Sequence, residues 1–151
     1  MQEVPAYDDV LAEVRGELTA AMAHAREAGV AADAILVDPG VGFAKQCAHN
    51  LQLLSRIGEL RRELGRPVMV GPSRKRFIAD VMQADFLQRE AMGSAIAGVQ
   101  DAAQLLGPDE RLPGTLAAVV LAVQAGADVV RVHDVLAARQ AVRVAEAIGH
   151  A

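Results

Sequence analysis

Three short apolar runs that each break into turn residues constrain the fold of this chain more than any other feature. They lie in the stretches 34–50, 67–75 and 128–134, and segments with helical periodicity separate them. A short apolar run bounded by turn residues is typical of a buried strand. Strands that alternate with helices predict parallel βαβ units, so we expect an α/β fold with three parallel strands.

Charged or polar side chains stand where these predicted strands end, namely Asp38, Lys75, Arg131 and His133. The carboxyl ends of parallel strands share one edge of the sheet, and ligands of such folds bind there. Because Arg131 and His133 are two residues apart, they lie on the same face of a strand. We therefore expect the four side chains to converge on one rim. Each also has a structural interpretation, as a turn residue, a solvated charge, a structural ion pair or an ordinary core histidine.

The segments between the strands carry apolar residues at helical spacing. Helices are expected at about 10–28, 50–64, 76–106 in two pieces, 115–125 and 135–148. Asp8 or Asp9 is a good N-cap for the first helix, Asn50 for the second and Asp134 for the last. The segment 115–125 is apolar on nearly every side, so we expect that helix to be buried.

Composition excludes several classes of function. The net charge of −4 gives no basic surface for nucleic acid. No apolar run approaches the roughly 20 residues that a membrane-spanning helix needs, and the N-terminus has no signal-peptide pattern. The single cysteine, Cys47, excludes an internal disulfide and fits a reducing compartment, and no helix start beside it indicates a reactive thiol. We expect one cytoplasmic domain with neither nucleic-acid nor membrane partners.

Three motifs, in order, carry a resemblance to a known family. They are D-P-G-V-G-F-A-K at 38–45, G-P-S-R-K at 71–75 and R-V-H-D at 131–134. Together they resemble the last three strand-end motifs of dihydropteroate synthase, whose fold is a (β/α)8 TIM barrel. Such a barrel typically needs about 250 residues. The resemblance therefore implies the C-terminal part of a barrel, with three strands present and the remaining strands missing. Residues 1–151 would form a single partial pterin-binding domain, with an atypical helical insertion at about 83–105.

The resemblance also implies a reaction and a set of site residues. Dihydropteroate synthase condenses 6-hydroxymethyl-7,8-dihydropterin diphosphate with p-aminobenzoate to give 7,8-dihydropteroate and diphosphate, in folate biosynthesis. By the motif match the catalytic residues are Lys75, Arg131 and His133. The substrate-binding residues are Asp38 and Lys75 for the pterin, Phe43 and Ser73 for p-aminobenzoate, and Arg131 and His133 for the diphosphate.

The N-terminal motifs of that family, among them N-x-T-P-D-S-F-S-D-G-G, do not occur in this chain. In the family they supply the metal ligand, so the resemblance implies Mg²⁺ as cofactor with its ligand outside this chain and no metal ligand within it. We expect the chain to be a truncated gene product or to start at an internal Met, and to lack full activity alone. The family also implies a homodimer through the C-terminal helices.

Two alternatives of other kinds remain open. One is a non-catalytic half-site protein that binds pterin or phosphate weakly or serves as an assembly partner. The other is a pterin-dependent methyltransferase domain of the same superfamily. The S-R-K and R-V-H motifs argue against the methyltransferase, because that chemistry has no diphosphate to hold.

Overall fold

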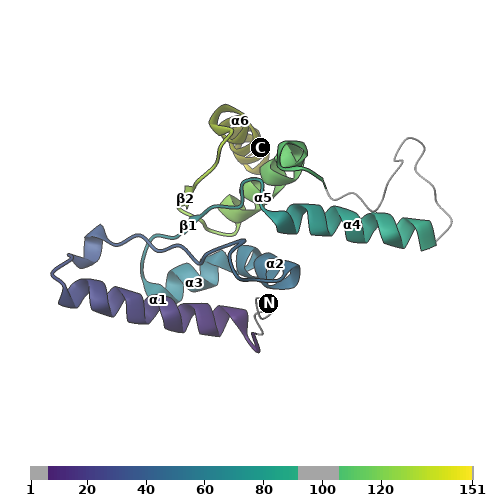
Figure 1. Cartoon of the computed structure of the whole chain (residues 1–151). Coiled ribbons are helices and arrows are strands. Elements are labelled where there is room, and N and C mark those ends of the chain that lie inside the picture. Colours follow the sequence, from purple (N-terminus) through teal and green to yellow (C-terminus); the bar gives the residue numbers. More distant parts are fainter. Residues whose placement is uncertain (1–6, 92–105, 151) are drawn as a thin grey trace.

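The computed structural model describes residues 7–91 and 106–150 of the chain. Its elements in chain order are α1 (Val10–Glu27), the short 3-10 helix η1 (Ala32–Ala34), α2 (Cys47–Ser55), α3 (Ile57–Leu64), β1 (Met69–Val70), α4 (Arg76–Ala91), the 3-10 helix η2 (Pro108–Arg111), α5 (Leu112–Gln124), β2 (Val129–Val130) and α6 (Val135–Gly149). The two strands lie between two groups of helices, with α1, α2 and α3 on one side and α5 and α6 on the other (Figure 1).

Strands β1 and β2 pair in parallel, which confirms the α/β class with parallel pairing. The partners across the ladder are Met69 with Val129 and Val70 with Val130. The first predicted strand is reduced to one parallel bridge between Val37 and Val68. The 3-10 helix η1 ends just before this bridge and Pro39, which has no N–H, follows just after it, so the segment has room for a single pair. The described residues therefore form two strands and a bridge where the sequence predicted three strands.

The core of the described residues consists of two clusters, which are aliphatic apart from Phe77. One cluster packs α1 against α2 and α3 and consists of Val10, Leu11, Val14, Leu53 and Leu60. The other cluster surrounds the strands and consists of Val37, Val41, Leu54, Ile57, Val68, Val70, Phe77, Ile78 and Ala122. Burial of one such large side chain stabilises the fold by about 1.5–3 kcal/mol.

The two helical groups also meet backbone to backbone. A Cβ on Gly58, near the start of α3, would lie 2.5 Å from the carbonyl oxygen of Ala125, which follows α5. On the other side of the contact, a Cβ on Gly126 would lie 3.2 Å from the Cα of Gly58. Only a residue without a side chain fits between these two segments of main chain.

Helix caps follow the sequence prediction at one end of the chain and depart from it at α2. Asp9 caps α1, and its Oδ1 accepts the N–H groups of Leu11 and Ala12 at 3.0 and 3.1 Å. The prediction of a cap at Asn50 is wrong, because α2 begins at Cys47 and Asn50 lies buried inside it.

Cys47 stands at the start of helix α2, contrary to the sequence prediction. Its thiol lies against the carbonyl oxygen of Phe77 at 3.6 Å, and burial raises its pKa, which opposes reactivity.

The apolar helix α5 is not buried on every side by the described residues, contrary to the prediction. Thr115, Val119 and Ala122 form its buried face, whereas the side chain of Leu121 is 62% exposed. α6 packs along α5 and covers part of the rest of its surface.

The helical insertion expected at about 83–105 falls partly in α4, which continues to Ala91, and its residues 92–105 lie outside the described residues. In the part of the chain that the structure describes, no helix combines the length and the apolar character needed to cross a membrane.

Candidate functional site

Parallel pairing brings the three predicted segments to one edge of the sheet. Val37 bonds beside Val68, and the main-chain N–H of Arg131 donates to the carbonyl oxygen of Val70 at 2.9 Å. The chain therefore leaves the sheet in the same direction at Asp38, at Gly71 and at Arg131. This edge is where ligands bind in parallel α/β folds.

A hollow of about 410 Å³ opens at this edge and collects most of the predicted site residues. Its lining consists of Gly71, Ser73, Arg74, Lys75, Pro108, Arg131 and His133. Four of the six residues that the sequence singled out are in this set. Asp38 and Phe43 are not part of the lining, and they adjoin it through Lys75.

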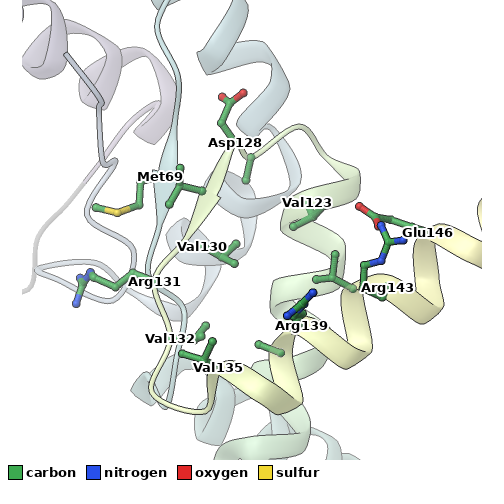
Figure 2. A pocket seen from close by; sticks show the side chains of 14 residues that line it. Met69, Val123, Asp128, Val130, Arg131, Val132, Val135, Arg139, Arg143 and Glu146 are labelled. Atoms are coloured by element: carbon green, nitrogen blue, oxygen red, sulfur yellow. The ribbon is translucent and has the colours of Figure 1, made fainter. Parts of the chain in front are cut away.

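Arg131 presents a cation with no carboxylate to neutralise it in the described part of the chain. Its guanidinium lies over Gly71, where an added Cβ would be 3.0 Å from Nη2 and 3.4 Å from Cζ. Figure 2 shows the Arg131 side chain leaving β2 on the side away from Arg139 and Arg143 of α6. A planar, unpaired guanidinium in a partly enclosed hollow is suited to binding the oxygens of a phosphate or diphosphate.

His133 is fixed by Ser73, which comes from the other strand end. The Ser73 hydroxyl oxygen and His133 Nδ1 lie 2.8 Å apart, and the main-chain N–H of His133 donates to the same oxygen at 3.3 Å. Ser73 is only 6% exposed, whereas His133 is exposed, so this hydrogen bond is partly buried. The remaining ring nitrogen, Nε2, is left available to a ligand, since no described residue bonds to it.

Lys75 links the hollow to the loop after Asp38. Its ammonium group lies 3.3 Å from the centre of the Phe43 ring, and its methylene stem packs on Gly42. Burial is the main cause of a lowered pKa for Lys75; the charge of Arg131 lowers it further, and Asp38 opposes both. The Lys75 ammonium and the Phe43 ring thus form a cation–π pair beside the hollow.

Asp38 keeps half of its carboxylate available. Oδ1 accepts the main-chain N–H of Gly40 at 2.8 Å, in the manner of a turn residue. Oδ2 accepts no hydrogen bond from any described residue. The structural and the ligand-binding interpretations of Asp38 are therefore compatible, because one oxygen holds the turn and the other accepts no hydrogen bond from the described residues.

Asn50, which the sequence prediction assigned to a helix cap, organises the loop that carries Phe43. It is 2% exposed, its side-chain oxygen accepts the N–H of Gly42 at 2.6 Å, and its amide donates to the carbonyl oxygens of Lys45 and Gln46. A usable signal was present, because position 50 lies on the same helical face as the apolar residues three and four positions later. A polar residue on that face must find its hydrogen bonds inside the protein.

Within residues 7–91 and 106–150, no three His, Cys, Asp or Glu side chains gather as metal ligands would. These residues therefore do not fit Mg²⁺ by themselves, and we derive no step through a metal.

Known proteins similar to this chain point to one family. A sequence model of the family described as "Pterin binding enzyme" matches residues 1–133. Dihydropteroate synthase of Escherichia coli strain K12 is 39% identical over 147 residues, which is 97% of this chain and 44% of that protein. Dihydropteroate synthase of Synechocystis is 40% identical over 149 residues, again 44% of its length. The chain thus spans less than half the length of these relatives.

Solved structures give the same result at the level of the fold. A crystal structure of dihydropteroate synthetase with a product superposes with a TM-score of 0.80 and 31% identity, covering 100% of this chain and 48% of that one. The dihydropteroate synthase of Xanthomonas albilineans in complex with 7,8-dihydropteroate superposes with a TM-score of 0.75 and 38% identity, covering 100% of this chain and 51% of that one.

Proposed function

Because this chain belongs to the family of pterin binding enzymes, we propose that it provides the diphosphate-binding side and part of the pterin-binding side of a dihydropteroate synthase site. The observation that carries the proposal is the unpaired guanidinium of Arg131 beside His133 in a hollow of about 410 Å³. Similarity to dihydropteroate synthases over nearly the whole chain supports it.

The roles follow from the chemistry of the groups. In the reaction the bond between the pterin methylene carbon and the diphosphate oxygen breaks, a bond to the amine nitrogen of p-aminobenzoate forms, and the amine releases a proton. Arg131 and His133 neutralise the charge of the leaving diphosphate, which lowers the barrier to its departure. Asp38, through the oxygen that no described residue bonds to, and Lys75 orient the pterin, while Phe43 and Ser73 border the p-aminobenzoate.

We further propose that residues 1–151 form one partial domain, the C-terminal strands and helices of a (β/α)8 barrel, and that the chain pairs with a second copy through its last helices. Apolar side chains exposed on α6 support this pairing, since Leu136 is 83% and Ile148 73% exposed. A second candidate is a binding protein without turnover.

Calorimetric titration with inorganic diphosphate and with a bare pterin tests the proposal. Arg131→Ala should weaken diphosphate binding about 10- to 100-fold, because a charge-assisted hydrogen bond to phosphate is lost, and should leave pterin binding nearly unchanged. The matched control is Arg143→Ala on α6, where the arginine pairs with Glu146 at 2.8 Å outside the hollow. Equal losses for diphosphate and pterin would refute the role of Arg131, and turnover with both substrates separates the enzyme from the binding protein.

A further inference from the structure

Arg74 stands between two site residues in a backbone conformation that arginine rarely adopts. Its φ is +59°, in the left-handed region. For a residue with a Cβ this conformation is disfavoured and persists only where the surroundings hold it. A left-handed residue turns the main chain sharply. The φ of Arg74 therefore determines the directions in which the Ser73 and Lys75 side chains point.

Side chains from other parts of the chain hold both peptide groups of Arg74. Its N–H donates to the hydroxyl oxygen of Thr115 at 3.0 Å, and Thr115 is 1% exposed. Its carbonyl oxygen accepts from Nη1 of Arg111 at 2.9 Å. The left-handed turn is therefore fixed by α5 and by the segment that precedes α5.

The side chain of Arg74 is engaged in a second set of contacts. Nε and Nη2 donate to the carboxylate of Asp134 at 3.1 to 3.3 Å, and Nη1 donates to Asp109 at 2.7 Å. Asp134 stands at the N-cap position of α6, as predicted, but its carboxylate bonds to Arg74 and not to the helix. Asp134 directly follows His133, so Arg74 ties the two strand ends together at their site residues.

We propose that Arg74 is a positioning residue: through Asp134 and Thr115 it holds Ser73 against His133 and holds Lys75 against the Phe43 loop. The inference rests on the proposed function in that Lys75 and His133 are ligand-binding groups. A purely structural ion pair would stabilise the fold without setting the state of the His133 ring. A direct anion ligand would act by its charge alone.

The first test uses no ligand. The ¹⁵N resonance of His133 Nδ1 reports the bond to Ser73, and it should move in Arg74→Ala and in Asp134→Asn. It should not move in the control Arg76→Ala, which removes a neighbouring exposed arginine paired with Asp80. Asp134→Asn removes the charge and one acceptor oxygen of the ion pair, and Thr115→Val removes one hydrogen bond. Both variants keep the arginine, so they cover the case in which Arg74→Ala does not fold. An unmoved Nδ1 resonance in Asp134→Asn overturns the proposal.

The second test measures the dissociation constant for inorganic diphosphate on the full chain. Arg74→Ala and Asp134→Asn should each raise this dissociation constant about tenfold. The double variant should bind diphosphate no more weakly than the single variant that binds it less tightly. Arg74→Lys keeps the charge but loses the planar fork, so it should not rescue binding. Full rescue by lysine, or additive losses, overturns the positioning role. If the unaltered chain binds no diphosphate, the proposed function fails, and the His133 resonance still decides the role of Arg74.

Discussion

Gly42 is the residue of the loop after Asp38 that packs against the Lys75 side chain. Gly42→Ala should therefore disturb both the loop and the position of Lys75. A Cβ at this position would lie 2.5 Å from Cδ, 2.8 Å from Cγ and 3.1 Å from Cβ of Lys75. The φ of Gly42 is +79°, a conformation that disfavours alanine in its own right. The substitution therefore has a backbone cost and a separate cost from displacing Lys75.

The two costs can be given magnitudes. A left-handed backbone costs an L-residue about 1–2 kcal/mol. Moving the stem of Lys75 takes its ammonium away from Phe43, which loses about 0.5–1 kcal/mol for an exposed cation–π pair. Gly42→Ala should thus lower the free energy of unfolding by about 1.5–3 kcal/mol.

Urea denaturation followed by circular dichroism measures these differences, with two controls. Gly29→Ala has a similar φ of +92° and no atom within 4 Å of the new Cβ, so it should show the backbone cost alone. A Lys75→Ala background removes Cγ and Cδ and leaves only the Cβ contact at 3.1 Å, so Gly42→Ala should there fall close to that backbone cost. The reasoning is refuted if Gly42→Ala costs as much with Lys75 truncated as with Lys75 intact.

Two further predictions concern Arg131. Gly71→Ala should displace the Arg131 guanidinium and weaken diphosphate binding about tenfold, while the free energy of unfolding changes by less than about 1 kcal/mol. Calorimetry measures the affinity and urea denaturation measures the stability. An unchanged affinity would contradict this prediction. Arg131→Met should raise the lowered pKa of Lys75, because one of its causes disappears, and an NMR titration of the Lys75 side chain should show it. The Lys75 ammonium of the unfolded chain holds its proton more tightly than that of the folded chain, so the free energy of unfolding should rise with pH just below 10.5. This rise should be less steep in Arg131→Met, and identical slopes for the two proteins would contradict the prediction.

The α/β class and the gathering of the predicted residues at one edge could be predicted because they depend on local patterns. Apolar runs ended by turn residues locate the bridge at Val37 and the strands at 69–70 and 129–130, and parallel pairing then places Asp38, Lys75 and Arg131 at one edge. The length of each strand could not be predicted, since it depends on the residues on either side. The burial of α5 was overestimated because an apolar pattern does not identify what covers each face.

The residues that hold the site were harder to find than the residues that line it. Charged groups at strand ends stand out in a sequence, whereas Thr115 and Asp134 act through hydrogen bonds to Arg74, 41 and 60 positions away, that no local pattern shows. The left-handed φ of Arg74 was also invisible, because tertiary contacts impose it on a residue type that does not favour it.

The main-chain contact between Gly58 and Ala125 acts as a mechanical stop between the two groups of helices. Side chains in a core can change rotamer and absorb a small displacement, whereas two backbones in contact cannot. The spacing between α3 and the end of α5 is thus limited by van der Waals contact between main-chain atoms, and position 58 is closed to any larger residue unless the two segments move apart. This contact therefore sets a lower limit to the distance between the two groups of helices.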